Sequence, residues 1–151
     1  MAEKLMPGPE HDRLQAFEGS WEGTKESPKG KWRGRMMMRR ALDGLFILQD
    51  FTQERDGQPE YAGHGVLGFD PSSKSYTWYW VDTMGSVSQV ARGVWDGPML
   101  RFEGRSDKGE EARYSYRFES NDQLQFCIER KTGGKWSQVS CFSYDRRLAS
   151  L

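Results

Sequence analysis

The sequence is short of several features that would assign it to a class at once. Two cysteines in 151 residues are too few for the disulfide framework of a small secreted scaffold. The two histidines form neither an H-x-H nor an H-x-x-x-H spacing, and the two cysteines form no C-x-x-C. The sequence therefore indicates no metal site and no cofactor. Basic and acidic residues balance at 22 each, so no net field favours nucleic acid. We therefore expect no metal, no cofactor and no nucleic-acid partner.

Long apolar runs are also missing. None approaches the roughly 20 residues of a membrane span, and residues 1–9 contain charge and proline rather than the apolar core of a signal peptide. A cytoplasmic protein without a membrane span is the expectation.

A two-residue turn at Gly133-Gly134 would pair Cys127 with Ser140, leaving Cys127 and Cys141 diagonal, so we expect reduced thiols. One added residue would place the cysteines opposite each other.

Turn signals are what the sequence has in abundance. They recur roughly every dozen residues, at positions 28–30, 43–44, 56–57, 70–71, 84–86, 96–97, 108–109, 121–122 and 133–134. Nine short turns predict about ten strands, each antiparallel to the next. So many long strands in one meandering sheet curl and close, which removes their exposed edges. The predicted fold is all-β, an up-and-down antiparallel barrel.

One segment has a helical pattern. Pro9 suits a first helical position, Leu14 and Phe17 share a face, and Gly19 can end the helix. The expected organisation is one barrel domain over residues 1–151, with a flexible segment at 1–8, a helix at 9–18 that caps one barrel end, and the barrel at 19–147.

Alternation predicts which side chains face the barrel interior. Tyr114, Tyr116 and Phe126 alternate with polar residues, as do Trp32, Met36 and Met38, whose neighbours are basic. Ten strands leave more interior room than eight. An internal cavity is therefore expected, with the basic residues between 29 and 40 on the outer wall.

The segment from Leu14 to Trp21, a helix followed by Gly19-Ser20-Trp21, resembles the entry motif of the calycins, which are lipocalin-like barrels. The resemblance implies that Trp21 packs under the helix at a closed barrel end. It also implies that an arginine at the end of the last strand, Arg146 or Arg147, stacks on Trp21.

A longer run comprises Gly57-Gln58-Pro59, Gly63 to Asp70, Tyr76, Trp80 to Gly85 and Gly93. It is similar to a bacterial family classed as a domain of unknown function, whose members share a lipocalin-like barrel. Nitrobindins, which bind heme, are a more distant resemblance. Their proximal histidine lies near the C-terminus, whereas no histidine follows His64 here, so heme is not carried over.

Residues 63–68 spell G-x-G-x-x-G, the phosphate-binding pattern of dinucleotide sites. That chemistry needs a helix directly after the motif, whereas Asp70-Pro71 and a tryptophan-rich strand follow. We instead expect the glycines to make room for indoles: a turn near Ser72 sets Gly65 opposite Trp80 and Leu67 opposite Trp78.

Tyr76, Trp78, Trp80 and Asp82 share one face of the next strand. This face is either packed core, with Asp82 serving a turn, or the floor of a pocket in which Asp82 supplies a directional polar contact. His64 and Asp82 are the candidate acid or base, without a visible partner. His11 is expected at the surface.

Three functions follow from these observations. The first is binding of a small hydrophobic or aromatic molecule in the lumen, with these contacts: Trp32, Met36, Met38, Trp78, Trp80, Asp82, Tyr114, Tyr116 and Phe126. The second is an enzyme that uses His64 or Asp82 in the same cavity. The third is a non-catalytic interaction module. The apolar run at 45–48 offers Phe46 and Leu48 to the outer face, which either the N-terminal helix or a second copy of the chain would cover; a homodimer through that face is one of these two alternatives.

Overall fold

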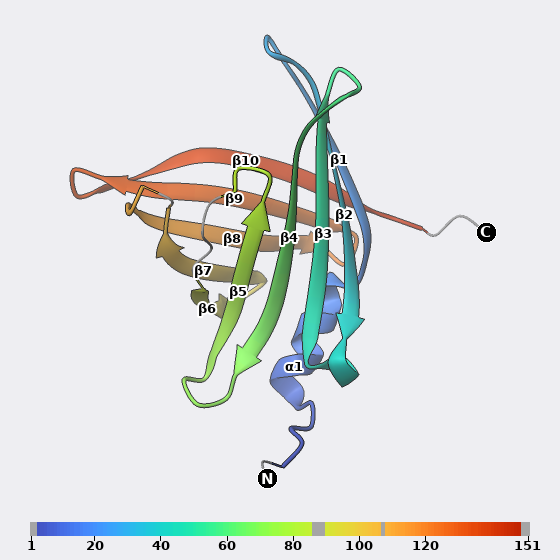
Figure 1. Ribbon diagram of the computed structural model, residues 1–151, viewed down its shortest axis with the longest axis vertical. Helices are drawn as coiled ribbons and strands as arrows, with labels where there is room; N and C mark the ends of the chain where they lie inside the picture. Colours follow the sequence, from blue (N-terminus) through green and yellow to red (C-terminus); the bar gives the residue numbers. More distant parts are fainter. Residues whose placement is uncertain (1–2, 86–89, 107, 149–151) are drawn as a thin grey trace.

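The computed structural model describes residues 3–85, 90–106 and 108–148. Its ten strands close into an antiparallel barrel in which each strand pairs with the next and β1 pairs with β10, as predicted. In Figure 1, β2 to β5 run across the direction of β7 to β10. The expectations for residues 1–8, for the turn at Ser86 and for a domain reaching residue 151 fall partly outside the described residues.

The elements follow the turn signals closely. A short helix α1 (Pro9–Leu14) and the 3₁₀ turn η1 (Gln15–Phe17) precede the barrel. The strands are β1 (Gly19–Ser27), β2 (Gly30–Ala41), β3 (Phe46–Arg55), β4 (Gln58–Asp70), β5 (Ser75–Asp82), β6 (Ala91–Asp96), β7 (Met99–Arg105), β8 (Glu111–Ser120), β9 (Gln123–Thr132) and β10 (Lys135–Arg147), with the 3₁₀ turn η2 (Leu42–Gly44) between β2 and β3.

The helical segment closes one end of the barrel. Phe17 is fully buried, and its carbonyl accepts a hydrogen bond from the Trp21 indole at 2.9 Å. The Arg146 guanidinium lies 4.3 Å from the Trp21 ring centroid, which is a cation–π stack. Arg146 also donates to the carbonyls of Ala16 and Glu18. The expected roles of Gly19, Trp21 and Arg146 at this closed end agree with this geometry, since β1 begins at Gly19.

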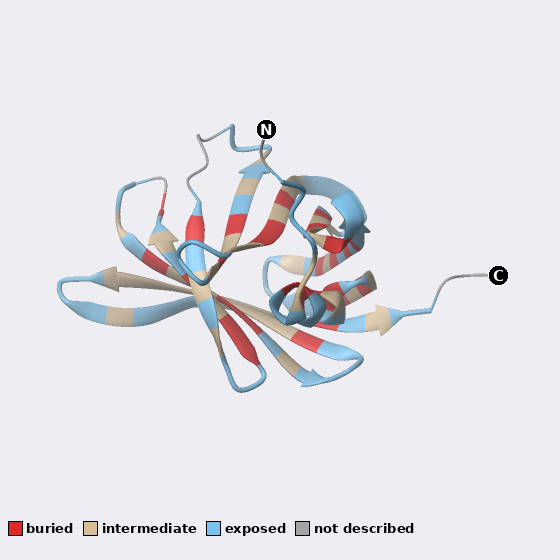
Figure 2. Ribbon diagram, turned by 90° about the horizontal axis from the view of Figure 1, so that it is seen from below, coloured by how far each residue is buried: buried red, intermediate tan, exposed pale blue. Residues whose placement is uncertain are grey.

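Buried and exposed residues alternate along the strands, as Figure 2 shows from the α1 side. In β2, Trp32, Met36 and Met38 are buried, whereas Met37 between them is 47% exposed. The basic residues lie on the outer wall, where Arg33 pairs with Glu22 at 3.0 Å. The period-2 pattern therefore assigned the faces of β2 correctly.

The cysteines differ from expectation. Thr132 pairs with Lys135 as predicted, but Val139 is an extra residue in β10, and the register shifts between Gln138 and Ser140. Cys127 therefore lies opposite Cys141, and the two form a disulfide. The prediction of reduced thiols was wrong because a β-bulge, invisible to turn counting, moved Cys141 by one position.

His11 also differs from expectation. It is 4% exposed rather than at the surface, its Nδ1 accepts a hydrogen bond from the Gly8 amide at 3.0 Å, and its ring packs edge-on against Phe69. The helix places His11 on its barrel-facing side, where the ring serves packing and capping.

The outer face of β3 is the surface through which a homodimer was predicted. Phe46 and Leu48 are half-buried, whereas Ile47 between them is fully buried. Phe46 covers Gly68 of β4, so part of this apolar set packs within the chain. The homodimer through Phe46 and Leu48 stays a prediction.

Candidate functional site

The barrel encloses a cavity of about 910 Å³ on the side away from α1. This volume lies within the range of small-molecule sites. Its lining is Trp32, Met36, Gln49, Phe51, Gln53, Tyr61, Trp78, Trp80, Asp82, Met84, Ala91, Gly104, Arg105, Ser106, Gly109, Tyr114, Tyr116, Phe126, Ile128, Arg130, Ser140, Phe142 and Tyr144. Members such as Asp82, Ser106 and Arg130 lie at or near strand ends opposite α1, so this end is the mouth of the cavity.

The floor of the cavity is organised by one amide. Gln49 is 2% exposed; its Nε2 donates to the Tyr116 hydroxyl at 2.9 Å, and its Oε1 accepts from the Trp78 indole at 3.1 Å. A Cβ on Gly65 would lie 2.7 Å from this Oε1, so glycine at that position leaves room for the amide. Burial raises the pKa of Tyr116, which keeps its hydroxyl protonated. The floor is thus polar but internally satisfied.

Aromatic rings form the wall above this floor. Trp78 contacts Tyr114 at 5.2 Å and Phe126 at 6.0 Å between ring centroids, and Tyr116 contacts Phe126 at 4.7 Å. On another side, Trp32 lies 4.6 Å from Phe142. Rings from β2, β5, β8, β9 and β10 therefore offer flat apolar surface to an occupant.

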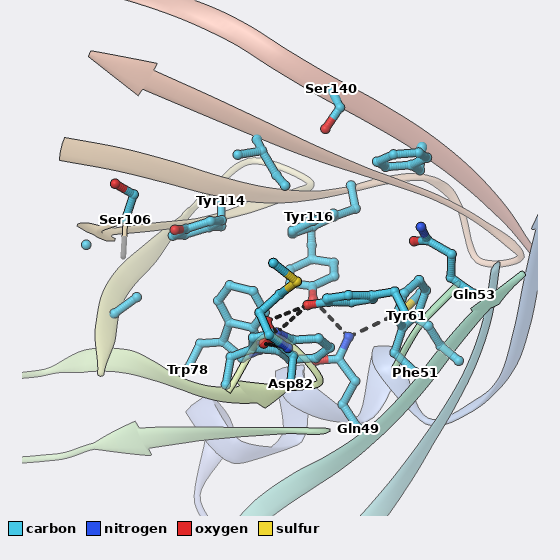
Figure 3. Close-up of a pocket in the computed structure, with 18 of the residues that line it drawn as sticks. Gln49, Phe51, Gln53, Tyr61, Trp78, Asp82, Ser106, Tyr114, Tyr116 and Ser140 are labelled. Carbon is cyan, nitrogen blue, oxygen red and sulfur yellow. Dashed lines mark hydrogen bonds between the residues drawn. The ribbon is translucent and has the colours of Figure 1, made fainter. Parts of the chain in front are cut away.

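Asp82 organises one side of the mouth (Figure 3). Its Oδ2 accepts from the Tyr61 hydroxyl at 2.6 Å and from the Trp80 indole at 3.0 Å, and its Oδ1 accepts from the Met84 amide at 2.9 Å. Burial and the hydrogen bond to Asp82 raise the pKa of Tyr61. These bonds hold Tyr61 and Trp80 in place, which is a positioning role for the carboxylate.

Of the residues predicted to contact a ligand, eight line the cavity: Trp32, Met36, Trp78, Trp80, Asp82, Tyr114, Tyr116 and Phe126. Met38 does not. It is 1% exposed and belongs to the packed core, next to Gly19 in the pairing of β1 with β2. The inward orientation of Met38 was predicted correctly. Whether an inward residue reaches the cavity depends on its position along the barrel, and Met38 lies near the end that the helix closes.

His64 lies outside the cavity. Its Nδ1 is 2.6 Å from the Asp50 carboxylate, and both side chains are exposed on the outer face of β3 and β4. For His64, the enzyme hypothesis needs a side chain that faces the cavity, and His64 does not line it. The partner Asp50 was missed because β3 and β4 bring it across the sheet rather than along the chain.

The glycine motif forms part of β4 and leads into a turn rather than a helix. Gly65 pairs with Trp80 and Leu67 with Trp78, as expected. A Cβ on Gly63 would overlap the Trp80 ring. Gly63 and Gly65 therefore make room for indoles, whereas Gly68 makes room for the Phe46 ring.

Several lining residues were not anticipated from the sequence. Gln49 and Phe51 continue the inward alternation of β3, and Ser140, Phe142 and Tyr144 do so in β10. The β3 residues follow an apolar run in which the alternation of apolar and polar residues cannot be recognised. The β10 residues follow the bulge, which shifts the register of the strand. Arg130 was missed because an arginine at an inward position is unusual.

The described residues hold neither a cluster of three His, Cys, Asp or Glu side chains suited to a metal ion nor a helix long and apolar enough to cross a membrane. The donors that face the cavity are amides, hydroxyls, indoles and two guanidinium groups. The chemistry available to the site is therefore hydrogen bonding, aromatic contact and charge pairing.

Comparison with curated protein sequences gives no match. Among solved structures, the chain is similar to the S-type phycobiliprotein lyase of Guillardia theta, with a TM-score of 0.58, 14% identity and 93% of each chain covered. At this identity the likeness concerns the fold. The model of a protein family described as "Protein of unknown function (DUF1579)" matches residues 6–146. The chain, with its barrel, capping helix and aromatic cavity, therefore belongs to the DUF1579 family.

Proposed function

We propose that this protein binds a small, largely apolar molecule with aromatic character in the lumen of its barrel. The observation that carries the proposal is the cavity of about 910 Å³ whose walls are mostly aromatic rings. Burial of apolar ligand surface against such walls contributes roughly 25 cal/mol per Å². Because the Gln49 floor is already hydrogen-bonded, an apolar body can cover it without orphaning its polar groups.

Binding is favoured over catalysis because the candidate acid or base groups are hydrogen-bonded within the protein or lie outside the lumen. The two oxygens of Asp82 accept from three donors within the protein, and His64 is paired with Asp50 outside the lumen. A general acid or base needs a substrate within hydrogen-bond reach. The enzyme hypothesis therefore lacks an observation of its own.

The lyase with the same fold is named for action on phycobiliproteins. At 14% identity the likeness to that lyase shows a shared fold and identifies no ligand for this chain. The proposal for this chain rests on its own lining residues.

The test uses the neutral fluorophore 1-pyrenebutanol and the intact protein. Energy transfer from the lining residues Trp32, Trp78 and Trp80 reports on binding. We expect saturable, one-to-one binding in the micromolar range. Ser140→Trp places an indole in the cavity and should weaken binding at least about tenfold, which corresponds to ~1.4 kcal/mol. Ser143→Trp, on the exposed side of the same strand, is the matched control and should bind as the parent does.

Absence of saturable binding, or equal loss in both serine variants, would contradict a lumenal site. Native mass spectrometry of the protein purified from its own cells complements this test. A stoichiometric non-covalent adduct, absent from the denatured sample, would support the proposal and give the mass of the natural ligand.

A further inference from the structure

The charged residues of the cavity are unevenly distributed. Its lining contains one carboxylate, Asp82, and two guanidinium groups, Arg105 and Arg130. The Asp82 oxygens are occupied by Tyr61, Trp80 and the Met84 amide. Asp82 belongs to β5 and Arg130 to β9, and three strands separate them in the barrel order. Among the described residues of the lining, Arg130 therefore has no carboxylate on its own side of the cavity.

Arg130 differs from its basic neighbours on the outer wall. Arg113 pairs with Glu103 at 3.5 Å and Lys131 with Glu111 at 3.4 Å. Among the described residues, Arg130 has no carboxylate within ion-pair distance, and this sets it apart from Arg113. Its Nε, like that of Arg113, is buried without a hydrogen-bond partner. A buried guanidinium donor without an acceptor carries a desolvation cost.

Arg130 lies on a stretch of the barrel where the neighbouring strands carry small residues. In the pairing across β7, β8 and β9, Gly104 lies opposite Ala112, and Ala112 lies opposite Arg130. Ser106 and Ser140 also line the cavity, and Figure 3 shows both across the cavity from Gln49. Small side chains on these strands leave room for a group of the ligand next to the guanidinium.

A second donor in the lining also lacks a partner. The Trp32 indole is 3% exposed, and its Nε1 is buried without an acceptor among the described residues. In contrast, the Trp78 and Trp80 indoles donate to Gln49 and Asp82. The unmet polar groups of the lining are thus N–H donors, which an acceptor-bearing ligand would satisfy.

We propose that the lumenal ligand carries a carboxylate, which Arg130 binds, while its aromatic body packs against the rings of β5, β8 and β9. This inference rests on the proposed function. A guanidinium presents a planar fork of donors that matches a carboxylate. The charge pair forms in a partly dehydrated cavity, where charge-assisted hydrogen bonds are stronger than at an exposed surface.

The test compares two probes with the same ring system and chain length, 1-pyrenebutyrate and 1-pyrenebutanol. We expect the parent protein to bind the carboxylate about ten- to hundredfold more tightly, the range that charge-assisted hydrogen bonds provide. Arg130→Gln should remove most of this preference, so that the variant binds the two probes with similar affinities. Arg130→Lys, which keeps the charge but not the fork, should retain a part of it.

Arg39→Gln is the matched control, since Arg39 is an exposed arginine on the outer wall of β2. It should keep the full carboxylate preference. Equal affinities of the parent for the two probes, or a preference that survives Arg130→Gln, would overturn the inference while leaving lumenal binding intact. Failure of both probes to bind the parent would overturn the inference and the proposed function together.

A crystal structure of the parent with 1-pyrenebutyrate provides a test that does not depend on the folding of any variant. The carboxylate oxygens are expected within hydrogen-bond distance of the Arg130 guanidinium. A carboxylate that points to solvent or binds elsewhere in the cavity would contradict the assignment.

Discussion

Single glycines in β4 determine the position of the indoles that border the cavity. Gly63 has no space for a side chain, because a Cβ there would overlap the Trp80 ring. That ring is held by hydrogen bonds to the Tyr61 hydroxyl at 2.9 Å and to Asp82 at 3.0 Å. Gly63 thus enables the polar cluster at the mouth, although it contacts no ligand itself.

At Gly63, substitution by alanine should lower the free energy of unfolding by about 1–3 kcal/mol, the usual cost of overpacking. The added methyl group forces Trp80 away from Tyr61 and Asp82. Urea unfolding, followed by circular dichroism, measures the loss. Gly104→Ala is the matched control: its Cβ would lie 3.2 Å from the Cβ of Ala91, so its effect should be smaller.

The double variant Gly63→Ala/Trp80→Leu tests the mechanism. Removing the indole relieves the overlap, so the double variant should be more stable than the sum of the two single effects implies. Strict additivity would mean that Gly63 acts through something other than Trp80.

Among the elements, β10 differs most from a regular strand. Its bulge at Val139 shifts the register between Gln138 and Ser140. The same shift puts Cys141 opposite Cys127 on the outer side and sets Ser140, Phe142 and Tyr144 toward the cavity. One extra residue therefore decides both the disulfide and the composition of one cavity wall.

The disulfide should stabilise the β9–β10 hairpin. Its cysteines are 14 residues apart, and closing a loop of this length contributes up to ~3 kcal/mol in the chain-entropy model. We expect the double variant Cys127→Ser/Cys141→Ser to unfold with a free energy about 2 kcal/mol lower, because the tight turn already restrains the hairpin.

Reducing agent provides the control for this prediction. Dithiothreitol should destabilise the parent by a similar amount and leave the double serine variant unchanged. Two thiols that titrate freely in the unreduced native parent would show that the bond is absent.

At the scale of the whole molecule, closure of the barrel buries phenol groups. Burial raises the pKa values of Tyr116 and Tyr144 above the ordinary value of 10. Between that value and the folded pKa, the folded state keeps a proton that the unfolded state has lost. Stability is therefore complete below pH 10 and falls as the pH rises above it, by about 1 kcal/mol per pH unit for each tyrosine.

Urea unfolding at pH 9, 10 and 11 should show this decline. Tyr144→Phe removes one of these buried phenols, so its stability should fall about 1 kcal/mol per pH unit less steeply than that of the parent. Tyr79→Phe, on the outer face, is the control and should follow the parent. An unchanged slope in Tyr144→Phe would contradict the assignment of the alkaline decline to buried phenols.

Local sequence signals were sufficient for the barrel itself. The turn-forming residues divide the chain into ten antiparallel strands, and alternation assigns Trp32 and Met36 inward and Arg33 outward. Turn geometry depends on a few residues, and the period of a strand is fixed at two, so both can be recognised without a partner strand. The family resemblance left Arg146 and Arg147 open as the residue that stacks on Trp21, and in the structure Arg146 does so.

What only the tertiary structure decided depends on distant parts of the chain. The bulge at Val139 reflects pairing with β9, the pairing of His64 with Asp50 needs β3 beside β4, and the burial of Met38 follows from the closed barrel end. The Arg130 Nε is buried without a hydrogen-bond partner only when the strands around it are in place. The turns and faces are local properties of the chain, whereas the contents and charge of the lumen are set by contacts between residues far apart in it.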